Sequence, residues 1–165
     1  WEIIDGVAYD MSPAPSVLHQ TSVGSFYAFL NAALRGRNCR PFVSPVDVVF
    51  SESSVVQPDV FVVCDPNKIT EKNIQGAPDL VIEILSPSTS KKDRWDKKDL
   101  YEQSGVREYI IVDPQAKYAE RYILGEDGRY DRGAVFDENQ SMALTSMDNL
   151  EMPLQELFSG IPAPE

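Results

Sequence analysis

The spacing of apolar residues predicts a hairpin and then a helix in the first part of the chain. Residues 1–11 form two short alternating runs around Asp5-Gly6, a dipeptide that favours tight turns between antiparallel strands. After Ser16, which is a good helix N-cap, apolar side chains recur at helical spacing until Gly36. The stripe that they form consists of His19, Val23, Phe26, Leu30 and Ala33.

The middle of the chain has the patterns of strands. Residues 40–50 alternate between apolar and polar positions, and residues 57–64 form a short apolar run that opens at Pro58-Asp59. Residues 79–85 are almost continuously apolar, which is typical of a strand buried on both faces. One charged residue, Glu83, interrupts this run.

The second half predicts a helix over residues 86–104, closed by Gly105. A strand follows at residues 108–113, then alternating strands at residues 119–124 and 129–136 that are joined by a turn at Asp127-Gly128. Residues 152–158 predict a short closing helix. The chain of 165 residues therefore predicts a single α/β domain, with a mixed β-sheet flanked by helices and extra N- and C-terminal strands.

Charge and composition narrow the classes of function. The net charge is −11, which disfavours broad tracking along a nucleic-acid backbone. The one clear basic cluster lies between residues 86 and 98, and its members are Lys91, Lys92, Arg94, Lys97 and Lys98. Apolar runs are far shorter than the ~20 residues of a membrane span, and residues 1–5 carry no secretory signal. We therefore expect no membrane association and a cytoplasmic location.

The two cysteines, Cys39 and Cys64, lack the spacing of a metal knuckle. Cys64 ends an apolar strand, where a free thiol behaves as a small hydrophobic side chain. We expect both cysteines to be reduced and structural.

Glu83, Asp59 and Lys97 are the candidates for chemistry. A carboxylate buried in an apolar strand is costly unless it is paired or binds metal, and Asp59 at the start of a neighbouring strand would place a second carboxylate nearby. Two such carboxylates suit a hard cation such as Mg²⁺ or Mn²⁺. Lys97 shares a helical stripe with Leu100 and Tyr101, so it is expected to point inward beside the sheet. Taken one at a time, each has a structural alternative: a buried ion pair, a turn aspartate or a solvated lysine.

A larger pattern resembles a known bacterial family described as putative restriction endonucleases, within the PD-(D/E)XK superfamily. The resemblance covers nearly the whole chain, and its most specific segments are Gln57-Pro58-Asp59-Val60, residues 76–89, residues 93–97, Leu100-Tyr101, Gly105-Val106 and Glu108-Tyr109. It also includes Ile4-Asp5-Gly6, Met11-Ser12-Pro13, His19 and Leu157-Phe158.

The resemblance implies a restriction-endonuclease-like core and names the site. Asp59 matches the superfamily's Pro-Asp aspartate, and Glu83 matches its acidic residue on the next strand. The superfamily lysine belongs two residues later, but Leu85 stands there; in the resembled family a lysine on the following helix takes its place, and Lys97 matches it. A metal would then be held by Asp59, Glu83 and the backbone carbonyl of Ile84.

Several further residues are weaker candidates. His19, the only histidine, either enters the site or caps and packs the first helix. Asp47 interrupts an apolar strand and is a further ligand or an ion-pair partner, and Asp79 shares a face with Glu83 and could support the ligands. Trp95 either stacks on a base or lies in a dimer interface. The substrate-binding candidates are Lys91, Lys92, Arg94 and Lys98.

The leading function is therefore a Mg²⁺- or Mn²⁺-dependent endonuclease that cuts DNA and forms a homodimer. Two alternatives remain open. One is a non-catalytic binding module on the same fold, and the other is a metal-dependent hydrolase of a small phosphate substrate, which would suit the acidic surface better.

Overall fold

The computed structural model describes residues 1–11, 14–87 and 94–160. Its main body is a six-stranded sheet with the order β11-β10-β9-β8-β6-β3. The strands β8 and β9 are parallel, while the other neighbouring strands are antiparallel, so the sheet is mixed. Its strands are β3 (Arg40–Val43), β6 (Val60–Val63), β8 (Leu80–Ile84), β9 (Glu108–Asp113), β10 (Tyr118–Ile123) and β11 (Ala134–Asp137).

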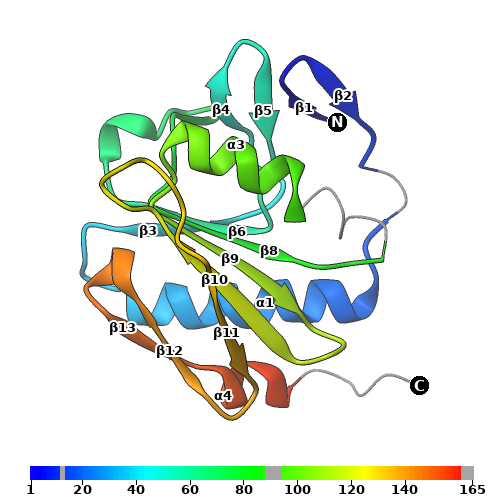
Figure 1. The fold of residues 1–165 in the computed structure, drawn as a ribbon, viewed down its shortest axis with the longest axis vertical. Coiled ribbons are helices and arrows are strands. Elements are labelled where there is room, and N and C mark those ends of the chain that lie inside the picture. Colours follow the sequence, from blue (N-terminus) through cyan, green and yellow to red (C-terminus); the bar gives the residue numbers. More distant parts are fainter. Residues whose placement is uncertain (12–13, 88–93, 161–165) are drawn as a thin grey trace.

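A second sheet of five short strands has the order β2-β1-β5-β4-β7 and stands beside the main sheet (Figure 1). A separate hairpin, β12 paired with β13, follows near the C-terminus. These strands are β1 (Glu2–Ile4), β2 (Val7–Tyr9), β4 (Val48–Ser51), β5 (Ser54–Val56), β7 (Ile74–Gln75), β12 (Ser141–Leu144) and β13 (Leu150–Pro153).

Helices cover both faces of the main sheet (Figure 1). The long helix α1 lies on one face together with the C-terminal hairpin and α4, and α3 lies on the other face with the five-stranded sheet. The helices and 3₁₀ turns are α1 (Val17–Ala33), η1 (Pro66–Lys68), α3 (Asp96–Ser104), η2 (Thr145–Met147) and α4 (Leu154–Ser159).

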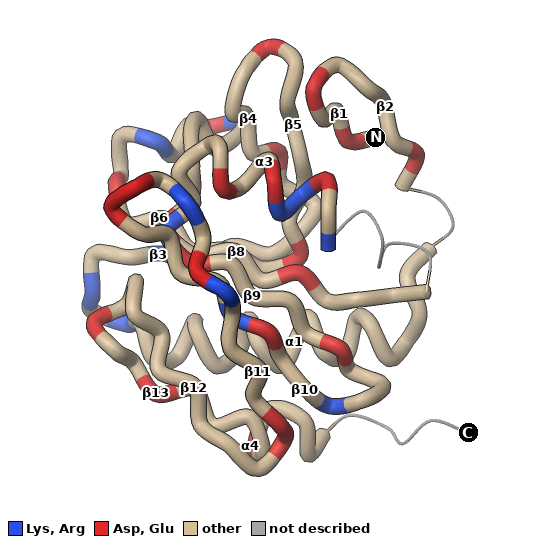
Figure 2. Tube along the Cα trace, viewed as in Figure 1, with Lys and Arg blue, Asp and Glu red and all other residues tan. Residues whose placement is uncertain are grey.

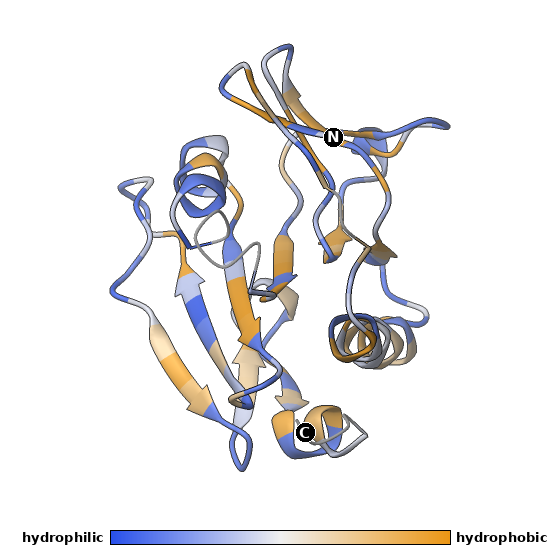
Figure 3. Cartoon of the chain, turned by 90° about the vertical axis from the view of Figure 1, so that its right-hand side faces the viewer, coloured by the Kyte–Doolittle hydropathy of each residue, from blue (hydrophilic) through white to orange (hydrophobic). Residues whose placement is uncertain are grey.

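Alternation along β6 and β8 explains why the sheet has an apolar cluster on each face. In β8, Leu80, Ile82 and Ile84 pack toward α1, whereas Val81 packs toward α3. Because successive side chains of a strand point to opposite faces, Glu83 is directed to the same side as Val81. Figure 3 shows the resulting concentration of apolar residues in the central strands and of polar residues in the loops.

Much of the predicted order of elements is confirmed. The hairpin around Asp5-Gly6, the helix capped by Ser16, and the strands at residues 79–85 and 108–113 all form. The Ser16 hydroxyl accepts the backbone N–H of His19 at 3.1 Å, and Gly105 ends α3 in the left-handed region. The part of the predicted helix at residues 88–93 lies outside the described residues.

The single strand predicted over residues 40–50 is wrong. The segment divides into β3 and β4, which belong to different sheets and are separated by a cis Ser44-Pro45 peptide. Proline has no N–H for a sheet ladder, so Pro45 marks the place where the chain leaves one sheet for the other. The residue before Pro45, Ser44, donates its backbone N–H to the backbone carbonyl of Asp59 at 3.0 Å.

Other boundaries also differ from the predictions. The strand expected at residues 129–136 begins at Ala134, and β5, β12 and β13 were not predicted. The C-terminal hairpin is secured by Glu108, whose fully buried carboxylate accepts the N–H groups of Thr145 at 3.1 Å and Ser146 at 3.0 Å. These bonds join β9 to the turn between β12 and β13. Such contacts between distant segments cannot be predicted from the local sequence pattern.

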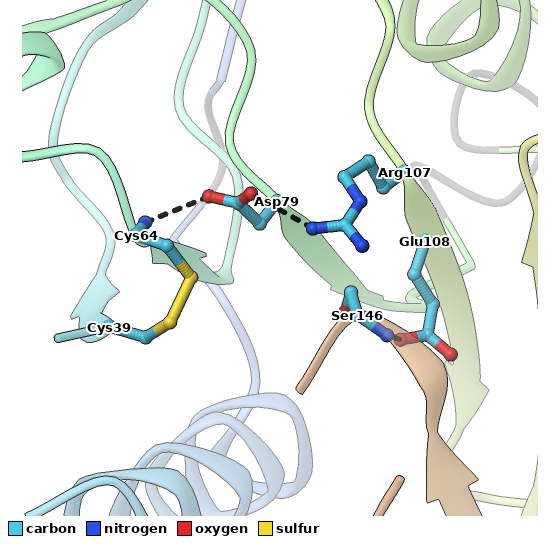
Figure 4. Close-up of a disulfide and its surroundings, with 6 residues drawn as sticks. All are labelled: Cys39, Cys64, Asp79, Arg107, Glu108 and Ser146. Carbon is cyan, nitrogen blue, oxygen red and sulfur yellow. Dashed lines mark hydrogen bonds and ion pairs between the residues drawn. A yellow bond between two sulfur atoms is a disulfide. The ribbon is translucent and has the colours of Figure 1, made fainter. Parts of the chain in front are cut away.

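The prediction of reduced cysteines is also wrong, because Cys39 and Cys64 form a disulfide (Figure 4). The reason is strand register. Arg40 in β3 lies opposite Val63 in β6, so the antiparallel ladder brings the preceding residue, Cys39, to the residue that follows, Cys64. Their separation in sequence hid this neighbourhood.

Reduction of the disulfide is expected to lower the free energy of unfolding by about 3 kcal/mol, because the bond closes a loop of 25 residues and limits the unfolded chain. Urea unfolding with and without a phosphine reductant measures the change. The double variant Cys39→Ala/Cys64→Ala is the control, since its unfolding midpoint should not respond to the reductant. An unchanged midpoint of the native protein would contradict the prediction.

Charged residues are distributed over both sheets, the loops and α3, whereas α1 carries no Lys, Arg, Asp or Glu (Figure 2). Acidic residues are spread in the same way, so the net charge of −11 does not come from one patch. No helix among the described residues is long and apolar enough to cross a membrane.

Candidate functional site

Glu83 lies at the centre of a buried polar group in the main sheet. Its side chain is 2% exposed and projects from β8 toward α3. One carboxylate oxygen, Oε1, accepts the Lys97 ammonium at 2.8 Å and the Tyr101 hydroxyl at 2.6 Å. The other oxygen, Oε2, accepts the backbone N–H of Asp59 at 3.4 Å. Glu83 is thus contacted by donors from α3 and from Asp59, the residue before the neighbouring strand.

Asp59 lies directly before β6, the strand beside β8. Its Oδ2 accepts the backbone N–H of Ile84 at 2.8 Å, while the Asp59 N–H is directed at Glu83. The two acidic residues are therefore linked reciprocally, each through the backbone of the other's strand. Pro58 is buried at the point where a missing N–H leaves no gap in the ladder.

His19 approaches the same carboxylate from the first turns of α1. Its Nε2 lies 3.3 Å from Asp59 Oδ2, and its Nδ1 lies 2.9 Å from the side-chain oxygen of Gln20. Burial lowers the pKa of His19, but the hydrogen bond and charge of Asp59 outweigh it, with smaller contributions from Gln20 and the Ile84 backbone, so the pKa is raised. When the ring is protonated, it forms an ion pair with Asp59.

Lys97 reaches the group from the second residue of α3. Its side chain is 3% exposed, and its ammonium lies between two carboxylates, 2.8 Å from Glu83 and 2.9 Å from Glu2. Glu2 belongs to β1 and is fully buried. The inward direction predicted for Lys97 from the helical stripe agrees with this position.

The charges and donor atoms fit a divalent cation. Among the described residues, the carboxylates of Glu2 and Glu83 contact the Lys97 ammonium, and that of Asp59 contacts His19; such a group of carboxylate oxygens suits a hard cation. Within the described ranges, no cluster of three or more His, Cys, Asp or Glu side chains could hold a metal by itself. Mg²⁺ commonly uses one or two carboxylates and keeps several waters, and Asp59, Glu83 and the Ile84 carbonyl could meet that need.

The structure places Asp47 and Asp79 apart from these residues. Asp79 precedes β8, four residues before Glu83, which corresponds to about 13 Å along a strand. It accepts the Cys64 N–H at 2.8 Å and lies 3.6 Å from Arg107 (Figure 4). Asp47 is exposed, and its carboxylate accepts the side-chain amide of Gln57 at 2.8 Å.

The four basic residues expected to bind substrate fall into two groups. Two of them contact other side chains of the protein, and two lie in a segment outside the described residues. Arg94 forms an ion pair with Glu120 at 2.7 Å and donates to the Tyr118 hydroxyl, and the Lys98 ammonium lies 4.2 Å from the Tyr122 ring centroid. Lys91 and Lys92 fall within residues 88–93, outside the described residues. Trp95 is 66% exposed.

A cleft of about 170 Å³ opens beside the site, at the C-terminal ends of β8 and β9. Its walls include His19, Ser86 and Asp113. The described residues that line it contain no lysine or arginine. The cleft reaches His19, whose Nε2 contacts Asp59.

Sequence reasoning missed two members of the buried group, Glu2 and Tyr101. Glu2 carries the same signal as Glu83, a carboxylate among apolar residues (Trp1-Glu2-Ile3-Ile4), but the short run was interpreted only as half of a hairpin. Tyr101 was placed on the inward stripe as a packing residue, and its hydroxyl was not assigned a partner. Both are brought to the site by contacts between distant segments.

Comparison with known proteins identifies the family of the chain and a related protein. The model of a family named Uma2 and described as "Putative restriction endonuclease" matches residues 1–155. A Synechocystis protein, slr1290, described as uncharacterized, is 30% identical over 129 residues, which cover 77% of this chain and 67% of that protein.

The fold is similar to that of a solved structure. A crystal structure of a putative nuclease belonging to DUF820 from Anabaena variabilis superposes with a TM-score of 0.80 at 22% identity, covering 98% of this chain and 90% of that one. The expected fold class, a mixed α/β nuclease-like fold, is confirmed by this similarity.

Proposed function

The chain belongs to the Uma2 family of putative restriction endonucleases, and on that premise we propose that it is a metal-dependent endonuclease that hydrolyses phosphodiester bonds in DNA. The observation that carries the proposal is the meeting of Asp59, Glu83 and Lys97. Asp59 directly precedes β6, Glu83 lies within β8 and Lys97 is the second residue of α3, and hydrogen bonds and an ion pair link the three.

The roles follow from the chemistry of each side chain. Asp59 and Glu83, with the Ile84 carbonyl, would bind Mg²⁺ or Mn²⁺, which polarises a phosphodiester and lowers the pKa of an attacking water. The Lys97 ammonium would offset the negative charge that develops on the phosphate oxygens. His19 would orient Asp59 through the contact between its Nε2 and Oδ2.

DNA contacts would depend on a limited set of basic residues. Arg94 and Lys98 are already engaged by Glu120 and the Tyr122 ring, so Lys91 and Lys92 are the proposed phosphate contacts. Binding along a DNA backbone needs one Lys or Arg side chain for each phosphate that is neutralised. Because the net charge is −11, we infer a short footprint on DNA rather than extended binding.

Cleavage of supercoiled plasmid and of single-stranded DNA by the purified protein, with Mg²⁺, Mn²⁺ or EDTA, tests the proposal. We expect nicking that requires the metal and disappears in Glu83→Ala and in Lys97→Ala. Activity that survives in Glu83→Ala would identify a contaminating nuclease or another site. Absence of cleavage with either metal, together with absence of metal binding by calorimetry, would overturn the proposal.

A further inference from the structure

We propose that Glu2 is a positioning residue of this site, which holds the Lys97 ammonium in place and keeps it there when Glu83 engages a cation. The inference rests on the proposed function for its catalytic consequence. Its structural part, that Glu2 restrains Lys97, does not depend on catalysis.

One oxygen of Glu2 joins the two sides of the site. Glu2 Oε1 accepts the Lys97 ammonium at 2.9 Å and the backbone N–H of Gln57 at 2.9 Å. Gln57 lies two residues before Asp59, whereas Lys97 lies on α3. Through a single carboxylate, the segment that leads into Asp59 and the helix that carries Lys97 are fixed relative to each other.

The position of Glu2 is itself well restrained. β1 pairs with β2 over three residues and with β5 at Ile3 and Val55, and Glu2 has no exposed surface. On the neighbouring β2, the Tyr9 hydroxyl donates to Asp96 at 3.4 Å, one residue before Lys97. The N-terminal hairpin is thus attached to the start of α3 at the point where the lysine projects.

Charge explains why a second acceptor is needed. Lys97 and a divalent cation would compete for Glu83, because both are positive and both seek its carboxylate. Lysine has a long flexible stem, so an ammonium displaced from Glu83 would otherwise leave the site. Glu2 remains as a buried anion 2.9 Å away and retains the ammonium beside Glu83.

The chain offers a matched control in Glu108. It is another fully buried glutamate, and its carboxylate accepts N–H and hydroxyl groups of Thr145 and Ser146. The shortest of these contacts is 2.6 Å, from the Ser146 hydroxyl; both residues are drawn in Figure 4. It belongs to β9 and serves the C-terminal hairpin. Glu108→Gln therefore reproduces the loss of a buried carboxylate without touching Lys97.

Amine acetylation followed by mass spectrometry measures the restraint on each lysine in the metal-free protein and with Mg²⁺. In Glu2→Gln, Lys97 should be acetylated about tenfold faster, since one charge-assisted hydrogen bond is weakened, and Mg²⁺ should widen the difference. Lys68 and Lys117 should keep their rates, and Glu108→Gln should leave Lys97 unchanged. If Glu2→Gln unfolds, all lysines will accelerate together; Glu2→Asp, which keeps the charge but shortens the side chain, then replaces it.

If Lys97 is acetylated at the same rate in folded Glu2→Gln as in the native protein, the proposal that Glu2 restrains Lys97 is overturned. For catalysis, we expect Glu2→Gln to lower kcat by about 10- to 100-fold with a small change in KM, because a positioning loss affects the transition state more than substrate binding. If the native protein cleaves no DNA, the proposed function fails while the acetylation result still decides the role of Glu2. If the native protein cleaves and Glu2→Gln keeps its kcat, the positioning role fails and the proposed function stands.

Discussion

Glu83→Gln is expected to lower kcat for metal-dependent DNA cleavage by about 10²- to 10³-fold or more, the range seen when one preorganised electrostatic group is removed. The substitution keeps the size of the side chain and an oxygen that can accept from Lys97 and Tyr101, which now bond Oε1 at 2.8 and 2.6 Å. What it removes is the negative charge that would bind the cation. Calorimetry should therefore show weaker binding of Mg²⁺ or Mn²⁺ in parallel with the loss of cleavage.

Asp79→Asn is the matched control for Glu83→Gln. Asp79 precedes the same strand and is also engaged by a backbone N–H, that of Cys64 at 2.8 Å, but it lies at the opposite end of β8. We expect cleavage by Asp79→Asn to be unchanged per folded molecule. Equal losses in the two variants would indicate that the strand tolerates no change in charge, and the special role of Glu83 would be contradicted.

Glu83 and Lys97 could be proposed from sequence because each breaks a local rule, whereas Asp59 was proposed from its place at the start of a neighbouring strand and from the family resemblance. Glu83 interrupts an apolar strand, and Lys97 occupies the inward stripe of a helix, so burial of a charge was implied before any contact was known. The register of β6 and β8, with Val60 opposite Ile82, then supplies what periodicity cannot, the placement of Asp59 beside Glu83.

The features that were missed depend on pairing between distant segments. Glu2 reaches Lys97 across 95 positions of sequence, and Cys39 meets Cys64 through the β3–β6 ladder. Asp47 shows the converse case. It resembles Glu83 as a charge in an apolar run, yet the chain changes sheets at Pro45 and leaves Asp47 exposed before β4. The pattern of a single sequence indicates on which face of a helix or strand a residue lies. Which residue it contacts depends on how strands distant in sequence are paired.

Lys97→Met is expected to lower the free energy of unfolding by about 3–5 kcal/mol, the usual cost of removing one partner from a buried ion pair. Methionine fills much the same volume, so the loss comes from charge: Glu2 and Glu83, which are 0% and 2% exposed, would both lose the ammonium between them. Urea unfolding measures the change. Cleavage should be lost as well, because the charge near the phosphate disappears.

A second substitution separates charge from packing in this prediction. If the cost is electrostatic, Lys97→Met/Glu2→Gln should recover part of the stability, since one of the two buried carboxylates becomes neutral. Added Mg²⁺ should stabilise Lys97→Met more than the native protein, because a cation bound at Asp59 and Glu83 would restore positive charge and no longer compete with an ammonium. A double variant less stable than Lys97→Met, together with no difference in the response to Mg²⁺, would mean that Lys97 stabilises the fold by packing alone.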